Sequence, residues 1–179
     1  MLVECPQELR TSRLLLTRIQ PADLNDLVAF YADREVTATL GGQRTSEWVA
    51  EYLYKQIDHW NENGFGYWTI RDLETGRFAG RGGLRFARIG ERDEVEVGYG
   101  LLADFWGRGL ATEVARESVR VGFENLFLPE VVSFTQPTNL ASKRVMEKAG
   151  FRYDRDIVYA NLPHVLYRLT AEDWRGIAP

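Results

Sequence analysis

Three strand candidates joined by short turns, between Tyr67 and Leu101, constrain the fold of this chain more than any other feature. They read YWTIR at 67–71, RFAGRGGLRF at 77–86 and EVEVGYGL at 94–101. The turn DLETG separates the first two, and GERD comes before the third. Links this short join antiparallel neighbours, because a parallel connection needs about a dozen residues or more. The sequence therefore predicts an antiparallel meander at the centre of the fold.

Helix and strand candidates flank this meander on both sides, identified by the spacing of their apolar residues and by their caps. Their order predicts a mixed α/β (α+β) fold, in which a mostly antiparallel sheet carries helices on both faces. The flanking candidates are a strand at 13–19, helices at 21–33 and 45–60, a helix from Leu110 to about Phe127, a strand at 130–135, a helix from Asn139 to Gly150, strands at 151–156 and 164–169, and a capped turn of helix at 170–174.

Length and composition limit the class of protein. The 179 residues suit a single domain, 1–179, with a core of about 10–175. A net charge of −4 shows no basic excess, so we expect no nucleic-acid partner. The one cysteine, Cys5, excludes an internal disulfide and suits a reducing cytoplasm. No segment reads as a signal peptide or a membrane span, so we expect a cytoplasmic location, no membrane partner, and a monomer or homodimer.

The stretch FWGRGLATE at 105–113 predicts an anion-binding loop. Two glycines bracket an arginine directly before a helix, where backbone N–H groups lack partners and the helix dipole adds partial positive charge. The nucleotide-triphosphate pattern needs Lys-Ser/Thr after the second glycine, but Leu110 and Ala111 stand there. In the dinucleotide pattern Thr112 replaces the third glycine. An anion other than these nucleotides is thus favoured, and a glycine turn without a ligand is the structural alternative.

The strand before this loop, EVEVGYGL, places two glutamates and two glycines on one face. Glycines inside a strand often mark a bulge or the close approach of a ligand. A bulge here would splay the strand from its neighbour, and an extended ligand with amide groups would pair with the freed backbone. The alternative is a glycine strand packed under a bulky helix residue.

Together these segments resemble the GCN5-related N-acetyltransferase (GNAT) superfamily, in particular the branch similar to the ribosomal-protein N-terminal acetyltransferases. Trp106 occupies the first position of the family's loop pattern, where a tryptophan is familiar in that branch. The resemblance implies a GNAT-like fold whose splayed strand pair holds acetyl-CoA. It covers nearly the whole chain through four segments, LRTSRLLLTRIQPADL, VEVGYGLLADFWGRGLATE, NLASKRVMEKAGF and YRLTAEDW.

The resemblance also implies which residues bind acetyl-CoA. The pyrophosphate would lie on the backbone of the loop and helix start, and the rest of the molecule along the splayed strand and the helix that Asn139 begins. Asn139 has a structural role as the helix cap available as well, and Lys143 belongs to a charged helix face that solvation alone would explain. The implied residues are Val97, Gly98, Tyr99, Arg108, Gly109, Leu110, Ala111, Thr112, Asn139, Ser142 and Lys143.

Acetyl transfer to an amine needs a proton acceptor, because an alkyl amine has a pKa near 10 in water. Glu96 is the predicted base and Glu94 the reserve, while solvated carboxylates are the structural alternative. A backbone N–H near Val97 or Gly98 would stabilise the oxyanion. Many family members carry a tyrosine where this chain has Met146, so Ser142 or Asn139 would hydrogen-bond the sulfur or the pantetheine instead. Of the two, Ser142 is the predicted catalytic group.

The sequence thus predicts an acyltransferase that moves an acetyl group to a primary amine by direct attack in a ternary complex. The acceptor is a protein N-terminus or a small amine, and residues 38–68 and 155–167 are expected to build its cleft. Trp48, Trp60 and Trp68 either line that cleft or fill the core. A non-catalytic acyl-CoA sensor or scaffold module is the second hypothesis, and no metal is expected.

Overall fold

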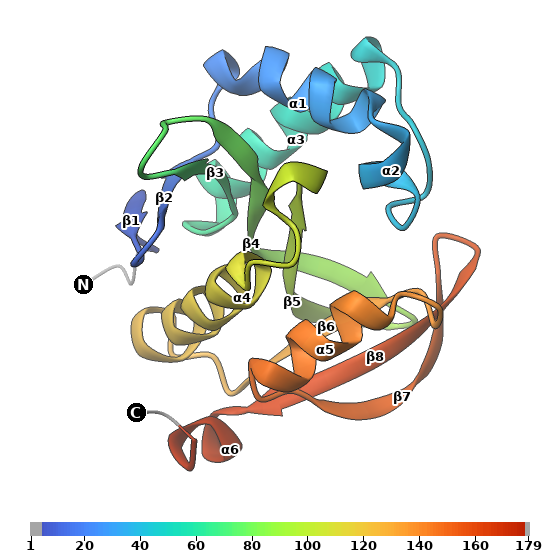
Figure 1. The fold of residues 1–179 in the computed structure, drawn as a ribbon. Helices are drawn as coiled ribbons and strands as arrows, with labels where there is room; N and C mark the ends of the chain where they lie inside the picture. The colour runs from blue at the N-terminus through green and yellow to red at the C-terminus, as the bar shows by residue number, and fades with distance from the viewer. Residues whose placement is uncertain (1–4, 178–179) are drawn as a thin grey trace.

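An eight-stranded sheet in the order β1-β2-β3-β4-β5-β6-β8-β7 runs through the computed structural model, which describes residues 5–177 (Figure 1). Neighbouring strands are antiparallel except for β5 and β6, which are parallel. The predicted meander is β3, β4 and β5, paired in sequence order. The strands are β1 (Glu8–Arg10), β2 (Leu14–Arg18), β3 (Tyr67–Asp72), β4 (Phe78–Ile89), β5 (Arg92–Leu101), β6 (Glu130–Thr135), β7 (Arg152–Tyr159) and β8 (Leu162–Thr170).

Helices cover both faces of this sheet, which confirms the predicted fold class. Gly100 of β5 faces Phe30 of α1, whereas Gly82 of β4 faces Val114 of α4 on the other side. No helix within residues 5–177 has the length and apolar character that crossing a membrane requires. The helices are α1 (Leu24–Ala32), α2 (Arg34–Thr37), α3 (Ser46–Asn63), α4 (Leu110–Arg120), α5 (Leu140–Lys148) and α6 (Ala171–Arg175), with 3-10 turns at Pro21–Asp23 and Ala103–Phe105 and a π-helical turn at Val121–Asn125.

Caps and apolar spacing in the sequence predicted most of these elements, but not the short elements β1 and α2. Thr45 caps α3 by accepting a hydrogen bond from the Trp48 N–H at 3.2 Å, and Gly64 ends the helix with a φ of 73°. The predicted helix at 21–33 is instead a 3-10 turn followed by α1, because the Asp23 carboxylate accepts from the Gln20 N–H and closes the turn there. β1 and α2 are too short to show a period.

Side-chain packing, rather than the predicted bulge, explains why β5 contains glycines. Pairing of β4 with β5 is continuous from Gly80–Leu101 to Ile89–Arg92, so the prediction of a bulge in β5 is wrong. A Cβ at Gly98 would overlap the Tyr67 hydroxyl, and one at Gly100 would lie 3.1 Å from Phe30 Cζ. Large side chains of β3 and α1 therefore occupy the space above these glycines.

Two of the three tryptophans considered for the acceptor cleft belong to the core. Trp68 is fully buried, and Trp60 is buried with its Nε1 donating to the Tyr67 carbonyl at 2.7 Å. Trp48 is 39% exposed and stacks on Tyr52, with ring centroids 5.3 Å apart. Only Trp48 thus faces outward.

His59 of α3 ties this helix to the edge of β4 that β3 leaves free. Its Nε2 accepts from the Phe86 N–H at 3.0 Å, and its Nδ1 lies 2.9 Å from the Phe65 carbonyl oxygen. Only the neutral ring with its proton on Nδ1 satisfies both contacts. Partial burial also lowers the pKa of His59 below its ordinary value.

His59 should therefore make the protein less stable in mild acid. The unfolded chain takes up this proton near pH 6.5, whereas the folded chain takes it up only at lower pH. The free energy of unfolding should be at its full value above about pH 6.5 and decrease as the pH falls below it. Urea unfolding at pH 7.5 and 5.5 measures the difference.

We expect a smaller loss of stability between these pH values in His59→Gln than in the wild type. His164→Gln is the matched control, because the Nδ1 of His164 contacts only the nearby Leu162 carbonyl oxygen among the described residues. An equal pH dependence in His59→Gln and the wild type would contradict the role of His59.

Candidate functional site

β5 and β6 are paired at one position and then part. Glu96 pairs with Val132, and Ser133 Oγ donates to the Val97 carbonyl at 2.8 Å. The N–H and C=O of a strand residue point to the same side, and this side alternates along the strand. Val97 therefore turns its backbone toward β6, and Tyr99 is the next residue to do so. Across residues 5–177 no strand pairs with Tyr99 on that side, so its amide groups face the gap that the sequence predicts.

The backbone of Gly98 turns the other way, toward Gly83 of β4, with which it is paired. Its N–H therefore does not reach the gap. Of the two predicted oxyanion donors, Val97 turns toward β6, but the parallel pairing of Glu96 with Val132 engages its N–H. Neither predicted N–H is therefore free at the gap.

The loop after β5 presents a row of backbone N–H groups. Gly107 and Gly109 have φ values of 70° and 76°, which other residues rarely adopt, and α4 begins directly afterwards. Trp106 Nε1 donates to the Leu101 carbonyl at 2.8 Å and fixes the loop on the end of β5. In the described part of the chain, the N–H groups of residues 108–112 have no acceptor. Five such groups at a helix N-terminus fit a diphosphate.

Arg13, which precedes β2, holds this loop in place. Its guanidinium donates to the Arg108 carbonyl at 2.8 Å and forms an ion pair with Glu113 at 2.7 Å. Partial burial raises the pKa of Glu113, but hydrogen bonds from Thr11, Arg13 and Ser12 outweigh it and keep that pKa below its ordinary value. Sequence reasoning missed Arg13, since nothing local relates it to a loop 95 residues away.

Asn139 and Ser142, at the start of α5, connect this helix to β6 and β5. Asn139 caps α5 by accepting from the Ser142 N–H at 3.1 Å, and its amide donates to Thr135 Oγ1 at 3.0 Å. Ser142 Oγ lies 3.0 Å from the Tyr99 hydroxyl. Burial raises the pKa of Tyr99, so this hydroxyl keeps its proton. Met146 is fully buried in the core.

Glu96 lies on the opposite face of β5, within a small polar cluster. Its Oε2 is 2.6 Å from Arg85 Nε, which also lies 3.1 Å from the Tyr67 hydroxyl. Its Oε1 points toward Gly98 and accepts no hydrogen bond from the described residues. Burial, together with the Glu96 charge, raises the pKa of Tyr67 to about 12. Glu96 thus has one carboxylate oxygen held and one available.

Arg85 and Tyr67 were not among the predicted site residues. A signal for Arg85 exists in the sequence, because Arg81 and Arg85 interrupt an otherwise uncharged part of β4 and share one face by the two-residue period. The YWTIR strand offers no comparable signal for Tyr67.

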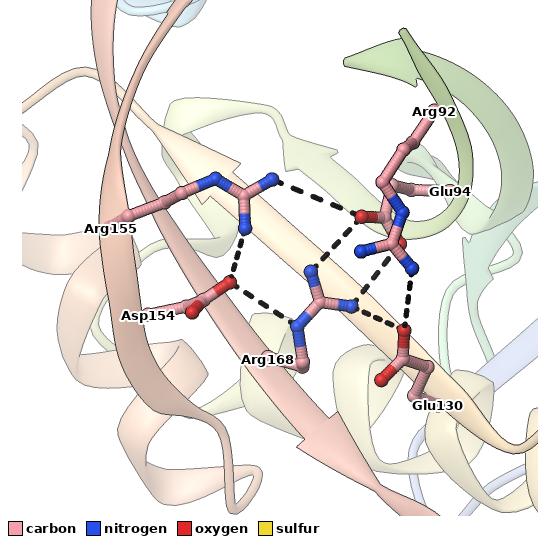
Figure 2. A network of polar contacts seen from close by, with 6 residues as sticks. All are labelled: Arg92, Glu94, Glu130, Asp154, Arg155 and Arg168. Carbon is pink, nitrogen blue, oxygen red and sulfur yellow. Dashed lines mark hydrogen bonds and ion pairs between the residues drawn. The ribbon is translucent and has the colours of Figure 1, made fainter. Parts of the chain in front are cut away.

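Glu94, the reserve base, belongs to a different network (Figure 2). Arg168 of β8 binds both of its oxygens, at 3.0 and 3.2 Å. The same guanidinium contacts Glu130 at 2.6 Å and Asp154 at 3.2 Å. Arg155 adds contacts with Asp154 at 2.7 Å and Glu94 at 4.0 Å. The Glu94 carboxylate is therefore occupied, and it joins β5 to the last strands of the sheet.

The remaining predicted positions, Arg108 and Lys143, are exposed and partly buried, respectively. Arg108 has 47% of its side chain exposed and approaches Asp72 only at 4.0 Å. Lys143 forms no ion pair within residues 5–177, so its ammonium is free for an anion or for solvent. No cluster of histidine, cysteine or carboxylate side chains in the described chain has the makeup of a metal site.

Comparison with known proteins places this arrangement in a family. Residues 13–152 match the model of the acetyltransferase (GNAT) domain. The uncharacterized protein YkkB of Bacillus subtilis is 31% identical over 167 residues, which cover 89% of this chain and 94% of YkkB.

Solved structures of acetyltransferases have a similar fold. An acetyltransferase from Agrobacterium tumefaciens is 28% identical with a TM-score of 0.80, covering 90% of this chain and 93% of its own. The aminoglycoside acetyltransferase AAC(6')-Ib in complex with coenzyme A shares the fold, with a TM-score of 0.79 at 19% identity over 93% of this chain and 99% of that one.

Replacing Arg13 by alanine should weaken the binding of coenzyme A. The change removes both the contact that holds the loop and a positive charge beside it. We expect the Kd to rise about tenfold, equivalent to about 1.4 kcal/mol, in isothermal titration calorimetry.

Arg10→Ala is the matched control, because Arg10 is an exposed arginine whose ion-pair partner is Glu8. It should leave the Kd at the wild-type value. A folded Arg13→Ala variant with wild-type affinity would show that the loop keeps its shape without Arg13.

Proposed function

This chain belongs to the GNAT family of acetyl-CoA-dependent acetyltransferases, and from that premise we propose that it moves the acetyl group directly to a primary amine in a ternary complex. One observation carries the proposal. The unpaired backbone of Tyr99 leads directly to the five unpaired N–H groups of residues 108–112, along one side of the sheet. An extended amide-containing chain that ends in a diphosphate matches both features, and acetyl-CoA has that structure.

In this proposal the loop binds the pyrophosphate through the backbone of Arg108, Gly109, Leu110, Ala111 and Thr112. Tyr99 pairs with amides of the pantetheine, and the acetyl group lies beside Val97, where β5 and β6 part. Lys143 lies near the start of α5 and contributes positive charge to the phosphate end. Asn139 acts through its cap, which holds Ser142 at the gap.

Glu96 is the proposed proton acceptor. Arg85 binds Oε2, whereas Oε1 faces Gly98. Glu96 and Gly98 lie on one face of β5, and the acetyl group lies at the edge of this strand, beside Val97. An ammonium acceptor gives one proton to Oε1, directly or through a water molecule, and the amine nitrogen then forms its bond to the acetyl carbon. When the carbon–sulfur bond breaks, the second proton of the nitrogen passes to the sulfur, and coenzyme A leaves as the thiol. The ion pair with Arg85 orients the carboxylate.

Ser142 is the proposed donor to the sulfur when the carbon–sulfur bond breaks. Its hydroxyl lies against the Tyr99 hydroxyl, so the two form a short hydrogen-bonded chain. Because burial raises the pKa of Tyr99, this phenol stabilises the thiolate by hydrogen bonding rather than by giving up its proton. The pair takes the place of the tyrosine that Met146 replaces.

Replacing Glu96 by glutamine tests the assignment of the base. We expect kcat to fall about 100-fold near pH 7.5, because an amide cannot accept the amine proton. The KM for acetyl-CoA should change by less than about threefold, since Glu96 lies on the other face of β5. Thiol release from acetyl-CoA with a panel of primary amines measures both constants.

The lost rate should return in part above about pH 9, where the amine begins to lose its proton in solution. Glu94→Gln is the control on the same strand face, and it should lower the melting temperature through Arg168 without this kinetic signature. A pH profile of Glu96→Gln parallel to that of the wild type would remove Glu96 from the role of base.

The same assay separates an enzyme from an acyl-CoA sensor. Binding of acetyl-CoA and coenzyme A should raise the melting temperature, and a ligand at 100 times its Kd adds about 2.7 kcal/mol of stability. ATP and NADH should give no comparable rise. Stabilisation by acetyl-CoA without turnover of any amine would favour the sensor.

A further inference from the structure

Arg81 of β4 is a buried cation without an acid beside it. The residue is 8% exposed, and its Cζ lies 5.8, 5.9 and 5.1 Å from the ring centroids of Phe30, Tyr31 and Tyr67. Its Nε donates to the Tyr31 hydroxyl at 3.2 Å. Within residues 5–177 no carboxylate oxygen lies within 4.0 Å of this guanidinium, and its two terminal nitrogens have no hydrogen-bond acceptor.

Other arginines on this face of the sheet are paired. Arg85 has Glu96 at 2.6 Å, and Arg168 has Glu94 at 3.0 Å. A guanidinium does not lose its proton in a protein, and burying it unpaired costs several kcal/mol. The aromatic rings offset part of that cost through cation–π contacts. An anion is the partner that would neutralise Arg81, and none of residues 5–177 supplies one.

The groups around Arg81 are also hydrogen-bond donors. The Tyr52 hydroxyl is buried without a hydrogen-bond partner among the described residues, and its ring lies 5.3 Å from that of Tyr31. The Tyr31 hydroxyl accepts from Arg81, and the Tyr67 hydroxyl accepts from Arg85, so the proton of each remains to be donated. Apart from Glu96 Oε1 beside Tyr67, these three phenols and the guanidinium have no acceptor among residues 5–177, as an anion receptor requires.

This cluster lies at a defined distance from the proposed site of acetyl transfer. A Cβ at Gly100 would be 3.7 Å from Arg81 Cζ, and one at Gly98 would meet the Tyr67 hydroxyl and Glu96 Oε1. Residues two apart on one face of a strand are separated by about 6.6 Å. An anion at Arg81 and an amine at Glu96 therefore fit within one small molecule.

We propose that Arg81, with the hydroxyls of Tyr31 and Tyr52, binds the carboxylate of the acetyl acceptor, and that this acceptor is a free amino acid. The inference rests on the proposed function and narrows it. A protein N-terminus carries a neutral amide where a free amino acid carries its carboxylate, so it would leave the guanidinium unpaired. The charge at Arg81 therefore selects the small amine over the protein N-terminus.

Transfer rates with the twenty L-amino acids and their primary amides test this inference. We expect at least one acid to react with a kcat/KM at least about 50-fold above that of its amide, the order of loss when a buried donor is left unpaired. Arg81→Met should bring this ratio close to one. Arg81→Lys keeps the charge without the planar fork and should give an intermediate ratio.

A stability measurement separates recognition from a structural role. Because Arg81→Met removes an unpaired buried charge, its melting temperature should equal or exceed that of the wild type. Arg85→Met, which leaves the buried Glu96 carboxylate unpaired, should melt at a lower temperature. A large loss of stability in Arg81→Met would assign the guanidinium to the fold and overturn the inference.

The outcomes also separate this inference from the proposed function. If amines without a carboxylate are acetylated as well as amino acids, and Arg81→Met affects both equally, the inference fails and the acetyltransferase function stands. If no amine is acetylated, the proposed function fails. Calorimetric titration of the same amino acids into the coenzyme A-loaded protein then decides the inference alone: binding that Arg81→Met abolishes supports it, and no binding overturns it.

Discussion

The parting of β5 from β6 after one residue pair is the constraint on which the rest of the site depends. β5 remains fully paired with β4, so the break affects only one of its edges. That edge leaves Tyr99 with free amide groups and brings Ser142 of α5 against its hydroxyl. Because side chains alternate along a strand, the same short segment directs Glu96 to the opposite face. A base on one face and a ligand channel on the edge can therefore meet near Val97.

Aromatic side chains line the face that carries Glu96, and its charges decide what it can accept. Tyr67 and Phe30 occupy the space that Gly98 and Gly100 leave. The buried arginines on this face differ in whether a carboxylate forms an ion pair with them. Paired guanidinium groups fix the geometry of their carboxylates, whereas an unpaired one, Arg81, has its full charge available for an anionic ligand. The same residue type thus supports either the fold or recognition.

Much of the fold could be predicted because its signals are local. β6 spans the predicted residues 130–135, and the caps at Thr45 and Asn139 act as their residue types indicate. The predicted bulge was wrong for a nonlocal reason. A glycine in a strand shows that something comes close, but the partner was a tyrosine from β3 rather than a ligand, and only packing identifies it.

The sequence by itself determined the meander, the glycine loop before α4 and the alternation that puts Glu96 and Gly98 on one face, because each depends on residues near one another in the chain. Only the tertiary structure decided that Arg13 supports the loop from 95 residues away, that Arg85 occupies one oxygen of Glu96, and that no acid of residues 5–177 pairs with Arg81. These contacts join separate elements, and the register and packing that bring such elements together are settled only when the whole sheet forms.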